Sequence, residues 1–317
     1  MGATNKWRSA AFTDAGRLRS ENQDRSYIND TLGVFLVIDG LGGHAAGEKA
    51  AETALEVIRV ELETTDAGDT RQRIRAAIAA ANNRICDLAQ ENGDWRGMAC
   101  VLTLAVMHDD RVIVGHVGDS RLYLIWNGAM RKLTSDHSPV GEREDRGELT
   151  ETEAMLHPRR HEVFRDVGTR HREPDDEEFV EMKEFLFKPD AAMLLCSDGL
   201  SDLITSAEMS EIIDRYDGDA ERVAHDLVDA ANRAGGKDNI TAVFVAGSEF
   251  LGNDSPQMAE ARARHSITRA REGAITQVSA PEAARSGTSR VRKALTSRVA
   301  FLIYGFAIGV ALALAWR

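Results

Sequence analysis

The sequence predicts an α+β domain built on antiparallel β-sheet, followed by a membrane helix near the C-terminal end. Three observations lead to this fold class. Residues 99–128 hold strand-like runs in succession with no helix between them, which favours an antiparallel meander over a doubly wound parallel sheet. Other segments space their apolar residues three and four apart, as amphipathic helices do. Residues 299–316 contain no charged side chain over a length that a bilayer accepts.

The strand-like runs are rich in β-branched and aromatic residues and are bounded by Gly, Asp or Asn. We expect strands at 7–13, 24–29, 33–39, 99–107, 111–118, 121–126, 191–197 and 240–246. We expect helices at 45–63, 69–91, about 205–215, and 219–234. The sequence "TSAE" at 205–208 has the form of a capping box and predicts where the third helix begins.

Composition predicts the domain boundaries. Residues 1–250 form one domain, which contains an irregular polar stretch at about 137–178. A loop of this length in a compact domain is usually a lid, a substrate-contacting flap or disorder. Residues 251–298 are rich in Ala, Arg, Ser, Gly and Glu and predict a basic flexible linker.

The uncharged segment 299–316, "VAFLIYGFAIGVALALAW", predicts a single membrane anchor. Under the positive-inside rule, the basic residues that precede it place the main domain in the cytoplasm. These residues are Arg290, Arg292, Lys293 and Arg298. Gly305, Gly309 and Ala313 recur at a spacing of four, which would permit weak dimerisation of two anchors.

The net charge of -12 is unevenly distributed. Residues 256–298 carry nine Lys or Arg against three acidic residues, so the domain before them is strongly acidic. Such a domain is poorly suited to the phosphate backbone of nucleic acid, and we expect no nucleic-acid partner. Cys86, Cys100 and Cys196 are widely spaced with no CxxC or Cys/His pairing, which indicates buried thiols in a reducing compartment.

Four aspartates stand at the ends of predicted strands. Asp39 ends "VFLVI", Asp119 follows "RVIVGHVG", Asp198 follows "AAMLLCS" and Asp238 precedes "NITAVFV". In an antiparallel sheet the end of one strand lies beside the start of its neighbour, so we expect these acids to converge at one edge. Crowded carboxylates repel unless a cation neutralises them, and Mg²⁺ and Mn²⁺ prefer such oxygen ligands. No thiol or imidazole cluster is expected to compete for a softer metal, and Gly40 can present its carbonyl to a cation.

Two other interpretations of residues 35–48 stay open from the residues alone. An Asp-Gly pair is a favoured hairpin turn, although here the chain continues into helical sequence. Gly40, Gly42 and Ala45 also satisfy G-x-G-x-x-A, and Glu61 follows at the distance that a dinucleotide site requires. This second interpretation needs a parallel sheet and leaves the other strand-end aspartates without a role.

Six motifs carry a resemblance to a known family. They are "TDAGRLRSENQD" (13–24), "VIDGLGGHAAGE" (37–48), "VGDSRLYL" (117–124), "LTSDHS" (133–138), "CSDGL" (196–200) and "KDNITAVFV" (237–245). In this order they resemble the metal-dependent protein serine/threonine phosphatases of the PP2C (PPM) family, most of all its bacterial members, over roughly residues 5–247. The resemblance implies an α-β-β-α sandwich of two antiparallel sheets flanked by helices. It also implies a binuclear Mn²⁺ or Mg²⁺ centre at one edge.

The resemblance further implies a role for each strand-end aspartate. Asp39 would bridge two metal ions, Gly40 would offer its carbonyl to one of them, and Asp198 and Asp238 would hold the other. Asp119, together with Asp198, matches the third metal site of bacterial relatives. Two cations would lower the pKa of a bridging water, giving a hydroxide that attacks phosphorus in line.

Three more residues take roles by the same resemblance. Arg19 corresponds to the arginine that grips the substrate phosphate, and its forked guanidinium suits two phosphate oxygens at once. Asp24 resembles a ligand to metal-bound water, and Asn239 supports the same shell.

The sequence departs from the family pattern at two positions. Leu41 stands where eukaryotic members carry a histidine that acts as general acid. The leaving group would then take its proton from water, from water on the third metal or, as a further hypothesis, from His44. Gln23 stands where many relatives carry Glu, which changes a hydrogen bond around the metals without removing a direct ligand.

The expected function is therefore hydrolysis of phosphoserine and phosphothreonine in proteins, opposing a bacterial Ser/Thr kinase. The expected location is the cell inner membrane, single-pass, with the catalytic domain in the cytoplasm. The alternative is a catalytically silent relative that binds phosphoproteins as a scaffold. The presence of Arg19, Asp39, Asp198 and Asp238 counts against that alternative, because a silent member would be expected to lose at least one of them.

Overall fold

The computed structural model describes residues 6–43, 45–64 and 69–254. The chain divides into two units, Met1–Ala263 and Arg264–Arg317, and only the first contains described residues. In this part of the chain no helix is both long enough and apolar enough to cross a membrane. The predicted anchor 299–316, the predicted linker from residue 255 onward and His44 all lie outside the described residues, so these predictions stay untested.

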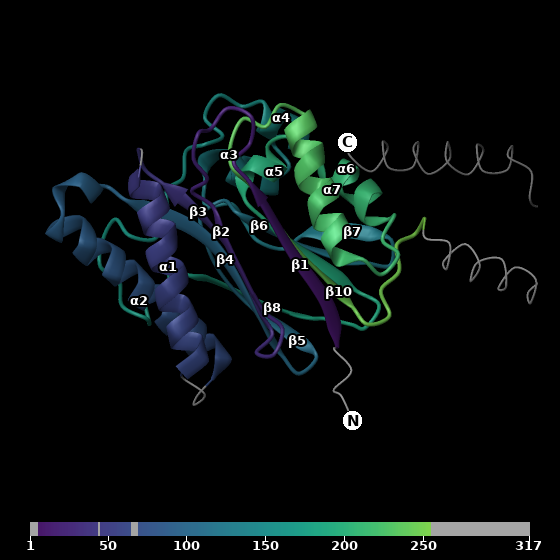
Figure 1. The fold of residues 1–317 in the computed structure, drawn as a ribbon, viewed down its shortest axis with the longest axis horizontal. Helices are drawn as coiled ribbons and strands as arrows, with labels where there is room; N and C mark the ends of the chain where they lie inside the picture. Colours follow the sequence, from purple (N-terminus) through teal and green to yellow (C-terminus); the bar gives the residue numbers. More distant parts are fainter. Residues whose placement is uncertain (1–5, 44, 65–68, 255–317) are drawn as a thin grey trace, which may run out of the picture. The chain divides into compact units, whose positions relative to one another are not determined.

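Two antiparallel sheets of five strands each form the centre of the described domain (Figure 1). The first, here called the β1 sheet, has the order β1 (Trp7–Asp14), β10 (Ile240–Gly247), β9 (Ala192–Cys196), β6 (Arg121–Trp126) and β7 (Ala129–Lys132). The second, the β2 sheet, has the order β2 (Arg25–Asn29), β3 (Val34–Leu41), β4 (Ala99–His108), β5 (Arg111–Val117) and β8 (Glu181–Leu186).

Helices cover the outer face of each sheet (Figure 1). The long helices α1 (Ala45–Thr64) and α2 (Thr70–Glu91) pack on the β2 sheet. The β1 sheet is covered by α6 (Ser206–Ile213) and α7 (Ala220–Arg233). Short elements complete the domain: the 3-10 turn η1 (Gly93–Trp95), α3 (Pro139–Asp145), α4 (Glu151–Met155) and α5 (Asp198–Ser201).

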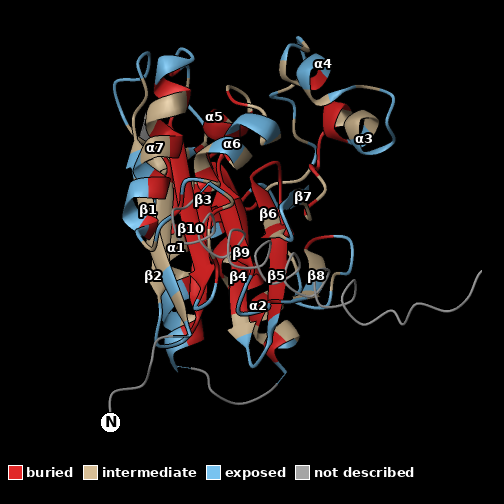
Figure 2. Cartoon of the chain, turned by 90° about the vertical axis from the view of Figure 1, so that its right-hand side faces the viewer, coloured by how far each residue is buried: buried red, intermediate tan, exposed pale blue. Residues whose placement is uncertain are grey.

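Alternation along β3 shows why the layers stack in this order. Val34, Leu36 and Ile38 are buried among residues of α1 and α2, whereas Phe35 and Val37 are buried among residues of β9 and β10. Successive side chains of a strand point to opposite faces, so a strand that is apolar at every position needs a partner layer on both sides. The buried residues accordingly run through both sheets and onto the inner faces of the helices (Figure 2).

The predicted sandwich of two antiparallel sheets with outer helices is confirmed, as are the eight predicted strands and the four predicted helices. Thr205 is the N-cap of α6 and forms the capping box with Glu208. The sequence prediction missed β7 and β8. It also treated residues 137–178 as irregular, but this flap contains α3 and α4 and is tied back to the domain by a bridge between Cys100 and Val167.

Candidate active site

Strand direction explains why the four strand-end aspartates meet. Strands β3 and β5 flank β4 and run in the same direction, so Asp39 near the end of β3 and Asp119 just after β5 share one edge of the β2 sheet. In the β1 sheet, the end of β9 lies beside the start of β10 because the two strands are antiparallel. Asp198 follows β9 as the first residue of α5, and Asp238 precedes β10. All four carboxylates thus gather at the same end of the sandwich.

One pocket collects nearly all of the predicted site residues. Its lining includes Arg19, Asp39, Gly40, Asp119, Asp198, Asp238 and Asn239. The remaining one, Asp24, is almost completely buried next to the pocket, where its Oδ2 accepts hydrogen bonds of 2.7 Å from the hydroxyls of Ser197 and Thr241. The expected convergence of the four strand-end aspartates is therefore confirmed.

Two buried carboxylate oxygens at this end of the sandwich have no hydrogen-bond partner among the described residues: Oδ1 of Asp24 and Oδ1 of Asp198. Burial raises the pKa of Asp24 to about 7, the hydrogen bonds from Thr241 and Ser197 oppose the rise, and the charges of Asp198 and Asp238 add to it. A buried oxygen without a partner costs free energy, and a hard cation would satisfy such atoms.

The pKa values of two further carboxyls are shifted in the same direction. Burial raises the pKa of Asp39 well above its usual range, and the charges of Asp24, Asp198, Asp119 and Asp238 raise it further. Burial also raises the pKa of Asp119, with Asp198 as the largest charge contribution. Positive charge in the pocket would favour the ionised form of these groups. The donor set, all carboxylate and carbonyl oxygen, fits Mn²⁺ or Mg²⁺.

Close packing of the backbone requires a glycine at position 40, independently of whether its carbonyl binds a metal ion. A Cβ at this position would lie 2.3 Å from the carbonyl oxygen of Gly47 and 2.9 Å from that of Gln23. No real Cβ tolerates such contacts with backbone atoms, so the end of β3 approaches the start of α1 only because residue 40 is glycine.

Arg19 lies at the mouth of the same pocket. Its Nη2 donates a hydrogen bond of 2.8 Å to Oδ2 of Asp238, and its side chain is 54% exposed. Among the described residues, Asp238 is the hydrogen-bond partner of the Arg19 side chain, so further guanidinium donors are available to a ligand in the pocket.

Asn239 holds the segment that carries Arg19 in place. Its Nδ2 donates to the carbonyl oxygens of Ala15 (3.0 Å) and Glu21 (2.8 Å), and its Oδ1 accepts from the backbone N–H of Gln23 (2.9 Å). The amide side chain is therefore fully engaged with residues 15–23. Its contribution to the site is to position this loop.

Two residues of the pocket were not predicted. His161 and Val163 come from the flap, and Nδ1 of His161 lies 3.7 Å from Oδ2 of Asp198. A hydrogen bond with Asp198 raises the pKa of His161. Leu41 also lines the pocket and offers no proton. No motif in the sequence marks His161, because it reaches the aspartates only through the path of the flap.

A buried ion pair anchors the flap to the β1 sheet. The guanidinium of Arg121 on β6 donates to both carboxylate oxygens of Asp136 at 2.6 to 3.1 Å and to Glu144 on α3 at 2.9 Å. Arg121 holds the pKa of Asp136 below its usual range despite the opposing effect of burial. The base of the flap is thus fixed beside the aspartate pocket.

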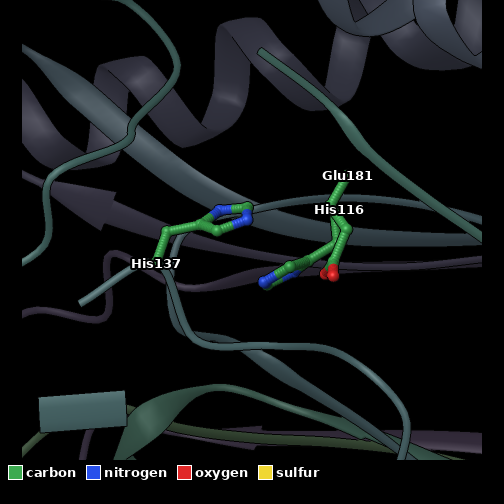
Figure 3. A group of neighbouring side chains, drawn as sticks. All are labelled: His116, His137 and Glu181. Atoms are coloured by element: carbon green, nitrogen blue, oxygen red, sulfur yellow. The ribbon is translucent and has the colours of Figure 1, made fainter. Parts of the chain in front are cut away.

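The prediction that imidazoles form no cluster is wrong. His116, His137 and Glu181 bring one potential ligand atom each to within 4.8 Å of one another (Figure 3). Their atoms are already engaged, however: His116 contacts Thr103 and the carbonyl of Ser135, and His137 accepts from Gly118 and contacts Arg165. A cation here would displace these bonds and face the guanidinium of Arg165, so the group serves to brace the chain beside Asp119.

The three cysteines take no part in the pocket. Cys86, Cys100 and Cys196 are free and buried, as predicted. Burial raises the pKa of the Cys196 thiol to about 12 and shifts the other two upward as well. Because the thiolate is the nucleophilic form, these residues are not suited to attack phosphorus.

Known proteins share both this sequence and this fold. A family model described as protein phosphatase 2C matches residues 17–231. The serine/threonine phosphatase stp of Listeria innocua is 36% identical over 242 residues, covering 74% of this chain and 93% of that protein. The crystal structure of the Mycobacterium tuberculosis serine/threonine phosphatase PstP/Ppp has a TM-score of 0.68 and 31% identity, and the match covers 76% of this chain and 98% of that one.

A second crystal structure, of the catalytic domain of PstP in complex with two manganese ions, has a TM-score of 0.66 and 30% identity over 76% of this chain and 97% of that one. The family model matches more than half of the chain, and the chain covers most of the Listeria protein. The chain therefore belongs to the protein phosphatase 2C family.

Proposed function

We propose that the chain is a protein serine/threonine phosphatase that depends on Mn²⁺ or Mg²⁺. The observation that carries the proposal is the gathering of four aspartates in one pocket beside Arg19: Asp39, Asp119, Asp198 and Asp238. Among the described residues, Oδ1 of Asp198 and Oδ1 of the neighbouring Asp24 are buried without a hydrogen-bond partner. The names of the Listeria and Mycobacterium relatives support the substrate class, and the manganese complex of PstP supports the choice of metal.

The residues divide into those that would hold metal and those that would hold substrate. Asp39, the carbonyl of Gly40, Asp198 and Asp238 would hold two ions, and Asp119 with Asp198 would hold a third. When bound, such ions acidify a water molecule for attack on phosphorus and neutralise the phosphoryl oxygens. Positive charge at this point would also ionise the carboxyls whose pKa values are raised.

Arg19 would receive the substrate phosphate. Its pairing with Asp238 leaves the guanidinium at the pocket mouth, and metal binding by Asp238 would release the arginine for two phosphate oxygens. Asn239 keeps the loop that bears Arg19 in register with β10. Asp24 would accept a hydrogen bond from water bound at the site through its unpartnered oxygen.

The proton for the leaving group has no donor at Leu41. We propose that water supplies it. The other donor that the sequence offers, His44, lies outside the described residues.

The cellular setting is also part of the proposal. The uncharged segment 299–316 with its preceding arginines would anchor the chain in the inner membrane and keep the phosphatase domain in the cytoplasm, opposing a Ser/Thr kinase there. Anchors with Gly305 and Gly309 on one face would associate weakly at most.

Hydrolysis of a phosphothreonine peptide tests the proposal directly. The full chain should be active with Mn²⁺, inactive with a chelator, and inactive as Asp39→Asn with Mn²⁺ present. The matched control Asp87→Asn changes an exposed aspartate of α2 and should keep full activity. Activity that is indifferent to both the chelator and Asp39→Asn would refute the metal-dependent function.

A further inference from the structure

A second pocket adjoins the aspartate pocket and has a different character. It shares Arg19, Asp198 and Asp238 with the first, and it adds Leu18 and Lys237. Because Arg19 lines both pockets, a peptide that places its phosphate at Arg19 would bring a residue next to the phosphorylated one close to the second pocket.

Lys237 is the uncommitted cation of the second pocket. Arg19 is paired with Asp238 at 2.8 Å, and Arg160, which also lines the pocket, is paired with Asp202 at 2.6 Å. Within residues 6–254, apart from the gaps at 44 and 65–68, the exposed Lys237 forms no ion pair. Its ammonium group is thus available to a group on the substrate.

The backbone holds Lys237 beside the loop that carries Arg19. The N–H groups of Arg17 and Leu18 donate to the carbonyl oxygen of Gly236, at 2.6 and 3.2 Å. Gly236 has a φ of +52° and no room for a Cβ, which would lie 2.6 Å from Oδ1 of Asn232. The turn before Lys237 is therefore fixed, and Leu18, 72% exposed, presents an apolar surface next to it.

We propose that Lys237 is a specificity-determining residue that favours phosphopeptides with an acidic residue directly beside the phosphorylated one. The inference rests on the proposed function and names its substrate class more closely. Metal ions on Asp198 and Asp238 would cancel the negative charge of the shared wall, leaving the second pocket positive and complementary to a carboxylate.

Matched peptides test the proposal. Phosphothreonine peptides carry Glu, Gln or Lys on one side of the phosphothreonine, then on the other, and kcat/KM is measured for each with the full chain and Mn²⁺. We expect the wild-type chain to favour Glu over Lys on one side by about 2- to 5-fold, the size of an exposed ion pair. Lys237→Glu should reverse this ratio, and the ratio should shrink toward one in high salt.

The ratio isolates the flanking residue, because a general loss of activity affects both peptides equally. Lys188→Glu is the matched control because it makes the same change of charge at the opposite end of β9 from the aspartate pocket. This variant should keep the wild-type ratio of kcat/KM between the Glu and Lys peptides. Hydrolysis of all peptides with no flanking preference, or a preference that persists in Lys237→Glu, would overturn the inference and leave the phosphatase function standing. Absence of metal-dependent hydrolysis of every peptide would overturn both.

Discussion

His137 binds Gly118 through two hydrogen bonds. The backbone N–H of His137 donates to the carbonyl oxygen of Gly118 at 2.7 Å, and the N–H of Gly118 donates to Nδ1 of His137 at 2.9 Å. Gly118 directly precedes Asp119 and has a φ of +109°, a conformation that L side chains rarely adopt. The imidazole therefore fixes the strained turn from which Asp119 enters the pocket.

Replacing the imidazole of His137 should weaken metal binding, although His137 does not line the aspartate pocket. His137→Ala leaves the buried N–H of Gly118 without its acceptor, which should cost about 1–3 kcal/mol of unfolding free energy. Because Asp119 loses its support, the Mn²⁺ concentration needed for half-maximal activity should rise about 10- to 100-fold. Urea denaturation and a Mn²⁺ titration of activity measure the two effects. The control His171→Ala removes an exposed histidine and should change neither the unfolding free energy nor the Mn²⁺ requirement. If His137→Ala has the same Mn²⁺ requirement as the wild type, the turn at Gly118 does not depend on the imidazole.

The metal-free protein should lose stability as pH rises. The folded-state pKa of Asp24 is about 7 against an ordinary value of 3.8, so folding favours its protonated form. Its contribution to stability is complete below about pH 4 and disappears as pH approaches 7. The lowered pKa of Asp136 acts only below this window, whereas burial lowers the pKa values of His116 and His137 and opposes the trend up to their ordinary value of 6.5. Thermal unfolding in chelator should thus give a lower midpoint at pH 8 than at pH 6.5.

Two additions sharpen the pH experiment. Saturating Mn²⁺ should raise the midpoint most at pH 8, because cations bind the ionised carboxyls. Asp24→Asn should flatten the pH dependence in chelator. An equal pH dependence of the midpoint in the wild type and in Asp24→Asn would contradict the assignment of Asp24 as a buried carboxyl with a raised pKa.

Removing the guanidinium of Arg19 should impair substrate capture. A hydrogen bond to a charged group contributes about 1.5–3 kcal/mol, so Arg19→Ala should lower kcat/KM for a phosphopeptide by about 10- to 100-fold. Arg19→Lys should have a kcat/KM between those of the wild type and Arg19→Ala, because lysine keeps the positive charge but lacks the two parallel N–H donors of the guanidinium. Arg59→Ala on the outer helix α1 is the control. Equal kcat/KM for Arg19→Ala and the wild type would remove Arg19 from the phosphate site.

Breaking the flap anchor should destabilise the domain. Asp136→Ala leaves the buried charge of Arg121 with Glu144 as its remaining carboxylate, and the expected loss is about 3–5 kcal/mol in unfolding free energy. The double variant Arg121→Met/Asp136→Leu should lose less unfolding free energy than Asp136→Ala, because it removes both charges of the ion pair. Arg159→Gln removes a surface pair and should change little. Urea denaturation ranks the variants, and a double variant worse than Asp136→Ala would contradict the argument.

The sequence predicts what its local pattern encodes. The continuous apolar run "VFLVI" is typical of a strand buried on both faces. The placement of four aspartates at strand ends is enough to predict a shared edge, and these are Asp39, Asp119, Asp198 and Asp238. Strand β8 was missed because most of its side chains are only partly buried, which leaves little apolar pattern. Strand β7 has four residues and no buried one.

Tertiary contacts that depend on the flap could not be predicted. His161 reaches Asp198 from a segment that looks irregular in the sequence, and its neighbours are polar. His116 and His137 are separated in the sequence by β6 and β7 and meet because the end of β5 lies next to the start of the flap in space. Such neighbours follow from the path of the backbone and not from any spacing along it.

Asn239 makes the site depend on both ends of the domain at once. It joins the start of β10, the last strand of the described residues, to residues 15–23, while β10 itself pairs with β1 over its whole length. Contacts of such long sequence separation form late in folding, because the intervening chain must first be ordered. A nascent chain that still lacks β10 can hold neither the loop of Arg19 nor Asp238. The enzyme should therefore gain activity only after the last strand has left the ribosome, and no shorter product of synthesis should dephosphorylate proteins.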